Sequence, residues 1–470
     1  MRIRRIIAAL AAACALLTGF GAADGGEVIT GSFSFMKTFS TEILQETYYY
    51  SDAYFSAPSS ADNPHLTTMS LALAVSTFEE GGSRFVTELL TGIGFQDIEA
   101  ADMDREPAPE TIGTAIGRKD TEYGTVIAVA VRGGKYKQEW ASTMTVGATG
   151  DAAGFAQAAE KVNARIRDYI GRHGLKDVRI WIAGYSRGGA VADLAAVGIC
   201  EDPEAYRTAP EAVYAYLFEA PGASGSDRVY PGIHSIRNRN DLIPLLLSES
   251  WGLYLNGTET LIGESKVIRT AKLDIMGMEL SEDGGETDME TAVRQITDFM
   301  ASELPREQYA SETEGAMSTL LSFWSGRSEA SGRQLREILS SSVIETLKAN
   351  PKLAGRLAMH AASALLLGGD RAWRELCDDL WEMIGPGISE GGLLTAEEAE
   401  RVRDGLYPIL HAFGPMIADD YAEGQGSRFA TLALHAEEIL YEHYPECVFP
   451  LVRALDFFYG GEQTNTEGAP

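Results

Sequence analysis

The chain has 470 residues, of which 45% are hydrophobic and 23% are charged. This composition is that of a folded protein with one large core or two smaller ones. The 68 acidic residues outnumber the 39 Lys and Arg residues, and the resulting net charge of −29 argues against nucleic acid or an anionic membrane surface as a partner.

The first residues have the order of an export signal. Arg2, Arg4 and Arg5 precede the apolar stretch IIAALAAACALLTGF, and the small residues GAAD follow it. This order predicts a signal peptide over 1–23, cleavage near Ala23, and a secreted or extracytoplasmic protein. A membrane anchor is the alternative, but the apolar stretch is shorter than the roughly 20 residues that a bilayer span needs. Nothing later in the sequence is long and apolar enough to span.

The cysteines predict neither a disulfide framework nor a metal site. Cys14 lies in the predicted signal peptide, so the mature chain keeps Cys200, Cys377 and Cys447 and can form one disulfide at most. Their irregular spacing fits no zinc pattern, and no His, Cys and Asp cluster has ligand spacing. We expect no metal and no cofactor.

Strands and helices alternate through the first half of the chain. Helical periodicity dominates from about 41 to 95, and the apolar run TVIAVAV predicts a buried strand over 125–131. A helix is expected over 153–170, because Phe155, Ala159, Val162, Ile166 and Ile170 share one face.

A second strand–helix pair follows at once. VRIWIAG predicts a buried strand over 178–184, and a helix is expected over 187–199. Two more strands are predicted over 212–222 and 232–241. Buried strands that alternate with helices indicate an α/β protein with a mostly parallel sheet flanked by helices, in which ligand sites lie at the carboxyl ends of strands.

After residue 260 the pattern becomes helical, including the runs AGRLAMHAASALLLGG and RAWRELCDDLWEMI, while GPGISEGG predicts a loop. We therefore divide the chain after the signal peptide into four segments. They are a core over 24–260, a helical insertion and candidate lid over 261–425, a return to the core over 426–458, and a disordered tail over 459–470.

The stretch AGYSRGGA places Ser186 in a G-x-S-x-G pattern between a predicted strand and a predicted helix. With 49 glycines in the chain the pentapeptide alone is weak, but the flanking elements are those of a nucleophile elbow. Such a turn holds the serine hydroxyl at a helix N-terminus, where the backbone amide of Arg187 can face an oxyanion. The alternative is a glycine-rich turn without chemistry.

A nucleophilic serine needs a base and an acid that orients the base, in the chain order Ser, Asp or Glu, His. Asp241 follows a predicted strand and is the best acid, with Asp227 as its main competitor, whereas Asp193 lies on the helix behind the serine. The candidate bases lie late in the chain; they are His411, His435, His443 and, less well placed, His360.

Several further motifs carry a family resemblance. They are VAVRGGKYKQEW, the Gly-Phe of AAGFAQAAEKV, IAGYSRGGAVADL, the Phe-x-x-Pro of LFEAPG, the D-x-x-P of DLIP, and HYPECVFPLVRAL. In their order and most of their spacings these motifs resemble the class 3 (fungal-lipase-like) lipase family, particularly its large exported bacterial members. The resemblance covers about 115–250 and 435–457, and SDAYFSAPSSADNPHLTTMSLALAVSTF near the N-terminus is also similar to these relatives.

The resemblance implies an α/β-hydrolase fold with Ser186 as nucleophile, Asp241 as the acid and His443 as the base, with His435 as the alternative base. It also implies an oxyanion hole formed by the backbone amides of Gly134 and Arg187. Gly134 departs from the many relatives that carry a hydroxyl residue there, and the long helical insertion separates the acid from the histidine.

These features favour a secreted serine ester hydrolase, a lipase or carboxylesterase that cleaves lipid-like esters through an acyl-enzyme. The alternative from another class is an inactive hydrolase scaffold that binds a partner through the helical insertion. A third hypothesis, acyl transfer to an alcohol, would use the same triad. The sequence leaves the oligomeric state open.

Overall fold

The protein is described by a computed structural model. Its described residues are 27–37, 42–79, 82–103, 111–133, 150–239, 241, 243–246, 252–262, 344–367, 370–390, 442–460 and a few positions between 399 and 410. The predicted signal peptide and most of the predicted tail lie outside these ranges.

The described residues form a seven-stranded sheet whose strands follow one another in chain order. The strands are β3 (Gln96–Ala101), β4 (Thr114–Thr121), β5 (Gly124–Val131), β6 (Val178–Tyr185), β7 (Val213–Phe218), β8 (Ile233–Asn238) and β9 (Thr258–Ile262). β3, β4 and β5 pair antiparallel, whereas β5 to β9 pair parallel. The predicted α/β fold with a mostly parallel sheet is thereby confirmed.

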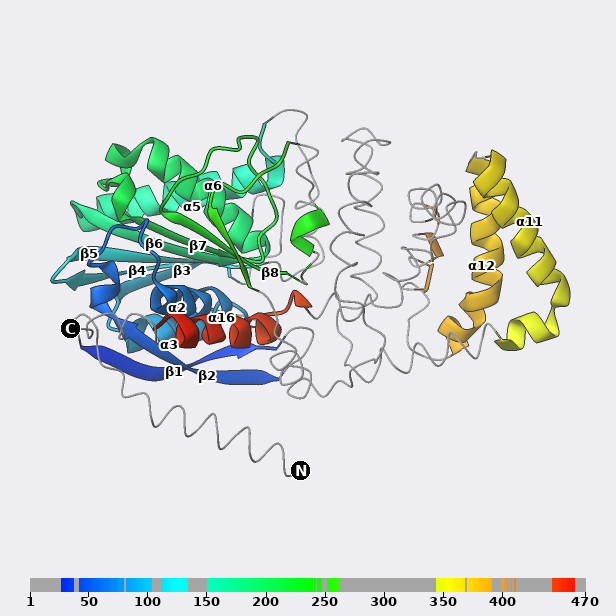
Figure 1. The fold of residues 1–470 in the computed structure, drawn as a ribbon, viewed down its shortest axis with the longest axis horizontal. Coiled ribbons are helices and arrows are strands. Elements are labelled where there is room, and N and C mark those ends of the chain that lie inside the picture. The colour runs from blue at the N-terminus through cyan, green and yellow to red at the C-terminus, as the bar shows by residue number, and fades with distance from the viewer. Residues whose placement is uncertain are drawn as a thin grey trace, which may run out of the picture.

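Helices cover both faces of this sheet (Figure 1). One face carries α5 (Ala153–His173) and α6 (Arg187–Glu201). The other carries α2 (Pro64–Val75), α3 (Arg84–Gly92) and α16 (Pro445–Gly460). Beyond these three helices lies an antiparallel hairpin of β1 (Val28–Met36) and β2 (Ile43–Ser51). The first two strands and the last helix of the described chain therefore lie on the same side of the central sheet.

A hydrophobic core lies on each face of the sheet, and successive side chains of the central strands point alternately into the two cores. Ile180 and Ile182 of β6 pack toward α5 and α6, whereas Trp181 enters the opposite, aromatic core. The indole of Trp181 is fully buried, and its Nε1 donates a hydrogen bond of 2.8 Å to Ser70 Oγ on α2. Because the sheet is buried on both faces, its strands read as continuous apolar runs, which is why the sequence reveals them.

The sequence-based predictions fail for strands outside the centre of the sheet. The helical periodicity assigned from about 41 to 95 is wrong for Ile43–Ser51, which is strand β2; helices begin only at Pro64. Strands β4 and β9 also went unpredicted. β4 carries Arg118, Lys119 and Asp120 at its solvent end, and β9 is a short edge strand with mostly exposed residues, so neither has the apolar run of a central strand.

Two helices are described within the predicted insertion. α11 (Pro351–Leu367) and α12 (Asp370–Glu390) pack on each other through a small cluster that includes Ala364, Trp373 and Leu376. The loop predicted at GPGISEGG is wrong for Gly385–Glu390, because α12 continues through Pro386 to Glu390. Gly385 is needed for packing, since a Cβ there would lie 2.8 Å from the indole of Trp381.

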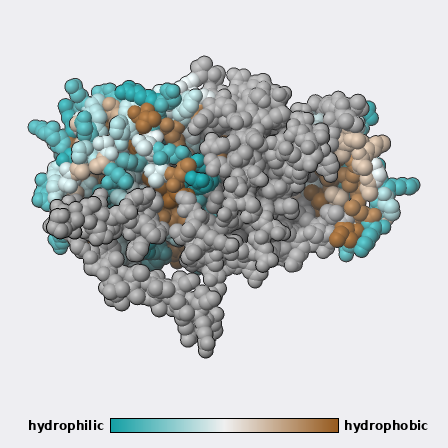
Figure 2. Space-filling view, in the orientation of Figure 1, coloured by the Kyte–Doolittle hydropathy of each residue, from teal (hydrophilic) through white to brown (hydrophobic). Residues whose placement is uncertain are grey.

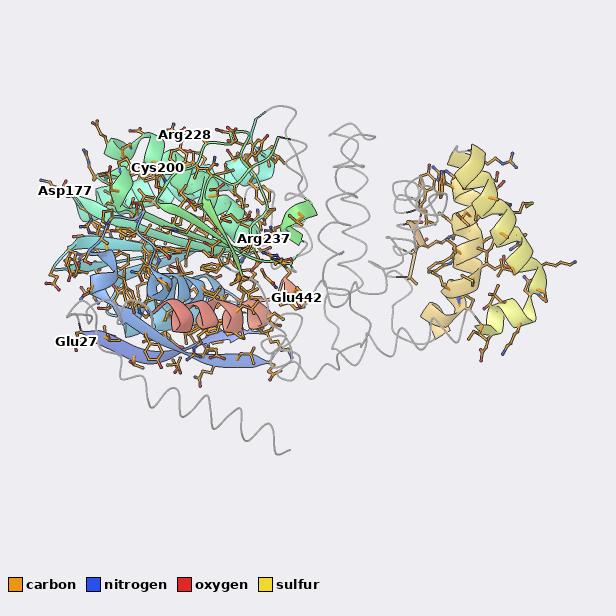
Figure 3. All side chains as sticks on the ribbon, viewed as in Figure 1. Glu27, Asp177, Cys200, Arg228, Arg237 and Glu442 are labelled. Carbon is orange, nitrogen blue, oxygen red and sulfur yellow. The ribbon has the colours of Figure 1, made fainter. Side chains whose placement is uncertain are left out.

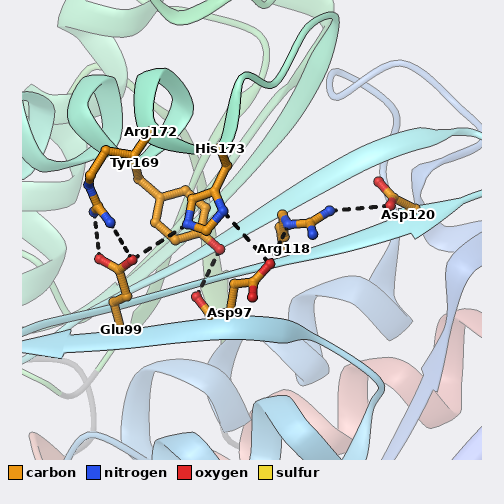
Figure 4. A network of polar contacts seen from close by, with 7 residues as sticks. All are labelled: Asp97, Glu99, Arg118, Asp120, Tyr169, Arg172 and His173. Atoms are coloured by element: carbon orange, nitrogen blue, oxygen red, sulfur yellow. Dashed lines mark hydrogen bonds and ion pairs between the residues drawn. The ribbon is translucent and has the colours of Figure 1, made fainter.

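A polar network fastens the end of α5 to the antiparallel edge of the sheet (Figure 4). Arg172 makes hydrogen bonds of 2.7 and 2.6 Å to the two carboxylate oxygens of Glu99 on β3. His173 lies 3.5 Å from the same carboxylate and 3.8 Å from that of Asp97. This histidine therefore has a structural place far from the serine elbow.

On the face shown in Figure 2, the described α/β core presents many hydrophilic residues, with smaller hydrophobic patches among them. Among the helices in the described ranges, none is long and apolar enough to cross a membrane.

One buried carboxyl group lies on α6. Asp193 is 0% exposed, and its two oxygens lie 3.2 and 3.1 Å from the backbone nitrogen of Asn256. Burial raises the pKa of Asp193 to about 8, from an ordinary value of 3.8. The folded protein thus keeps a proton that the unfolded chain releases.

We predict that the free energy of unfolding falls less steeply with rising pH in the Asp193→Asn variant than in the wild type. The contribution of Asp193 to stability is fully present below about pH 4 and is lost as the pH rises to about 8. Within this window the residue lowers the free energy of unfolding by up to about 1.4 kcal/mol per pH unit, and the amide removes that slope. Urea unfolding at pH 5, 6, 7 and 8 measures it. The exposed Asp227→Asn is the control, and parallel curves for all three proteins would contradict the prediction.

Candidate active site

Ser186 lies at a sharp turn between β6 and α6. Its φ of 52° and ψ of −123° place a non-glycine residue in a sparsely populated backbone region, which costs on the order of 1–3 kcal/mol. The turn is held from outside, because the backbone N–H of Ser186 donates a hydrogen bond of 2.8 Å to the carbonyl of Phe218 at the end of β7. The hydroxyl is thereby fixed at the N-terminus of α6.

Two glycines make this turn possible. A Cβ on Gly184 would overlap the carbonyl of Gly188, one turn into the helix. A Cβ on Gly188 would lie 2.5 Å from the carbonyl oxygen of Val131 at the end of β5. The flanking glycines of the motif are therefore required by the close approach of α6 to β5 and β6.

The imidazole of His443 lies between Ser186 and Asp241. Its Nε2 is 2.8 Å from Ser186 Oγ, and its Nδ1 is 2.6 Å from Asp241 Oδ2. Asp241 is 0% exposed and His443 is 8% exposed, whereas Ser186 remains partly exposed. An ionised Asp241 accepts a hydrogen bond from the Nδ1–H tautomer, which leaves Nε2 able to accept the proton of the serine.

Two strands hold the segment that carries His443. The phenol of Tyr185, next to the serine, donates a hydrogen bond of 2.8 Å to the carbonyl of His443. Burial raises the pKa of Tyr185 well above its usual range, so the phenol keeps its proton. From β8, Asn238 Nδ2 donates to the backbone oxygen of Glu442 at 3.1 Å and to its Oε2 at 2.7 Å, at the edge of the core seen in Figure 3.

A second carboxyl group lies beside Asp241. Glu219, the residue after β7, is 0% exposed, and its two oxygens accept hydrogen bonds of 2.9 and 3.0 Å from the backbone N–H of Asn238. Burial raises the pKa of Glu219 well above its ordinary value, and the charge of Asp241 and a side-chain hydrogen bond to it raise it further. The acid of the candidate triad thus has a carboxyl neighbour.

The competing candidates lie elsewhere or outside the described residues. Asp227 is exposed, and Asp193 binds the backbone of Asn256. His360 pairs with Asp379 Oδ2 at 2.7 Å within the α11–α12 pair. The remaining candidates lie outside the described residues; they are His411, His435 and Gly134.

The described ranges contain no group of three or more His, Cys, Asp or Glu residues arranged to hold a metal ion. Cys200, Cys377 and Cys447 do not pair with one another.

Residues 116–250 match the model of the family described as Lipase (class 3). Over this region the chain is similar to the class 3 lipase family. The match supports a lipase-type hydrolase, a class whose substrates are lipid esters. A search of curated proteins found no match.

Among solved structures, the crystal structure of M37 lipase is similar to this chain, with a TM-score of 0.31 and 11% sequence identity. The alignment covers 51% of this chain and 80% of that one.

The sequence did not reveal the residues that support the three central side chains of this site. Tyr185 lies within the G-x-S-x-G motif and Glu219 within the Phe-x-x-Pro motif, and neither motif gives these two positions a role. Asn238 lies within a predicted strand. A polar residue in an otherwise buried strand was the available signal, because a buried polar group requires a partner.

Gly188→Ala is predicted to destabilise the fold, and Gly171→Ala is its matched control. The added methyl at 188 must displace the backbone of β5, which costs about 2 kcal/mol or more. Gly171 lies exposed in α5 with nothing within 4 Å of a built Cβ, so alanine there stabilises by about 0.5–1 kcal/mol. Thermal and urea unfolding of both variants measure the difference. Equal stability of the two would show that the elbow tolerates a side chain.

Proposed function

We propose that this class 3 lipase is a serine ester hydrolase that cleaves lipid-like carboxylic esters through an acyl-enzyme intermediate. The observation that carries the proposal is the unbroken chain of contacts from Ser186 Oγ to His443 Nε2 at 2.8 Å and from His443 Nδ1 to Asp241 Oδ2 at 2.6 Å. The family supports a hydrolase of lipid esters, and the strained, partly exposed serine is where a nucleophile is expected.

In the first half of the reaction, Ser186 Oγ attacks the ester carbonyl carbon while His443 Nε2 takes the hydroxyl proton. Asp241 holds the imidazole by Nδ1 and stabilises the imidazolium that forms. As the tetrahedral intermediate collapses, the carbon–oxygen bond to the alcohol breaks, and His443 returns the proton to the leaving alkoxide. Water then attacks the acyl-enzyme with His443 as base, which releases the acid and regenerates the serine.

The developing oxyanion requires backbone donors at the elbow. Arg187 is the first residue of α6, so its N–H points from a helix N-terminus toward the space beside Ser186 Oγ, and the helix dipole adds to this stabilisation. Gly134, which lies outside the described residues, would supply the second amide by analogy with the family.

We propose a substrate that carries no charge near the ester bond that is cleaved. The acidic protein repels anionic lipid surfaces, so a neutral lipid or a soluble ester is the better match. The helical insertion follows Asp241 in the sequence. We propose that it forms a lid or part of the pocket for the acyl chain.

Ser186→Ala should abolish ester hydrolysis and covalent labelling by a fluorophosphonate probe. Removal of the nucleophile is expected to lower kcat by roughly 10⁴-fold or more, because the remaining site offers only binding and oxyanion stabilisation. A series of nitrophenyl esters of increasing acyl length measures hydrolysis. The exposed Ser60→Ala makes the same chemical change away from the site and should leave rates unchanged.

Two outcomes would contradict the proposal. Equal rates for wild type and Ser186→Ala would remove this serine from the mechanism. Failure of folded wild-type protein to react with the probe would favour the other hypothesis, an inactive scaffold that binds a partner. Added alcohols test the third, since transfer of the acyl group to them, in place of hydrolysis, identifies an acyltransferase.

We also propose that the enzyme is exported and that its signal peptide is removed after Ala23. The basic, apolar and small-residue segments of 1–23 support this proposal. In a bacterial host, the exported protein should begin at Asp24 when its N-terminus is sequenced. Ala23→Asp places a charge at the cleavage position and should block processing, whereas Ala22→Ser should not. Retention of the full-length wild-type chain in the cytoplasm would contradict export.

A further inference from the structure

Glu219 places a second carboxyl group in the most deeply buried part of the candidate site. It follows β7 directly, has a φ of 48°, and donates its own N–H to the carbonyl of Ile236 on β8 at 3.0 Å. Its side chain therefore turns toward the end of β8, where Asn238 N–H binds both of its oxygens. Asp241 is attached to the same residue, because its N–H donates to the carbonyl of Asn238 at 3.0 Å.

Two ionised carboxylates in one buried site repel each other strongly, so one of the two groups must hold a proton. Asp241 Oδ2 lies 2.6 Å from His443 Nδ1, and an ionised carboxylate is the stronger acceptor for that N–H. Glu219 accepts from a backbone N–H and makes a side-chain hydrogen bond to Asp241. The proton between the two carboxyl groups therefore stays on Glu219, whose O–H donates a hydrogen bond to Asp241.

The charged and titratable groups around Glu219 agree with this assignment. From β8, Arg237 is the positive group that acts on Glu219, but its effect is weaker than those of burial and Asp241, so the pKa of Glu219 stays well above its ordinary value. From β6, the Tyr185 phenol is neutral because burial and the nearby carboxyl groups raise its pKa. His443 is connected to Glu219 through Asp241, whose Oδ2 lies 2.6 Å from His443 Nδ1.

We propose that Glu219 is a positioning residue that stays protonated at neutral pH and donates a hydrogen bond to Asp241, fixing this carboxylate against His443. The proposal rests on the proposed function and deepens it. A neutral donor leaves Asp241 with a single negative charge, so the imidazolium formed during acylation faces one ionised carboxylate that cannot rotate away. Glu219 does not touch substrate, and its effect passes through Asp241.

The first test compares Glu219→Gln with Glu219→Ala. Glutamine has nearly the shape of the neutral acid, keeps an amide donor for Asp241 and keeps an oxygen for Asn238 N–H. We expect Glu219→Gln to retain kcat within about threefold of wild type and to leave the acid limb of the kcat/KM pH profile in place, because the charge is unchanged. Alanine removes the donor and should lower kcat by about 10–100-fold with little change in KM, since the triad is misplaced.

A shift of the acid limb is the contrary result. If Glu219 were ionised, glutamine would remove a negative charge near His443 and move the acid limb down by about one pH unit. That outcome, or full activity of a folded Glu219→Ala, would overturn the proposal. Loss of activity in both variants would also count against it, if circular dichroism and melting show that Glu219→Gln is folded.

A second measurement needs neither a variant nor activity. In wild-type protein labelled with ¹³C only at the glutamate carboxyl carbons, one resonance should remain at the position of a protonated carboxyl group at pH 7. If every glutamate carboxyl is ionised at pH 7, the proposal fails even if the enzyme is an active esterase. If Ser186→Ala and wild type prove equal in ester hydrolysis, the proposed function fails, and the protonation of Glu219 is still decided by this spectrum.

Discussion

The whole site depends on the close approach of α6 to the carboxyl ends of β5, β6 and β7. Within a few residues, one backbone must leave β6, pass Ser186 at positive φ and enter a helix that touches β5. That geometry is strained, and it persists because the surrounding sheet is buried on both faces and the Ser186 N–H is bound to the end of β7. The rigid scaffold is therefore what presents a serine in a conformation that a loop would not keep.

The central part of the fold could be predicted because burial leaves a local signature. The runs at 125–131 and 178–184 are continuously apolar, as strands covered on both faces must be. The hairpin strand Ile43–Ser51 has one buried face and alternates, and its three consecutive tyrosines obscure that period. The charged residues of β4 are tolerated because they lie at its solvent end. Edge elements obtain their stability from pairing partners, which a single sequence does not show.

The candidate site was predictable to the extent that its residues stand in motifs. The strand and helix around Ser186 predict it as a nucleophile. The order of the family's motifs predicts that Asp241 and His443 lie near it. The state of Glu219 could not be predicted, because a glutamate is ordinarily an ionised surface residue. Its protonation depends on the fold, because β7 and β8 bring Glu219 into a buried space with a second carboxyl group.

Asn238 links the two ends of the long segment that separates the acid from the base. Its carbonyl accepts from Asp241 N–H, where that segment begins, and its side chain donates to Glu442, where the segment returns. Farther along, α16 is tied to the hairpin by the Arg453–Glu46 ion pair at 3.0 Å. Since the entropy of closing a long loop grows only slowly with its length, the insertion can be long at little cost in stability once its ends are fixed. The relative positions of Asp241 and His443 therefore do not depend on the length of the chain between them.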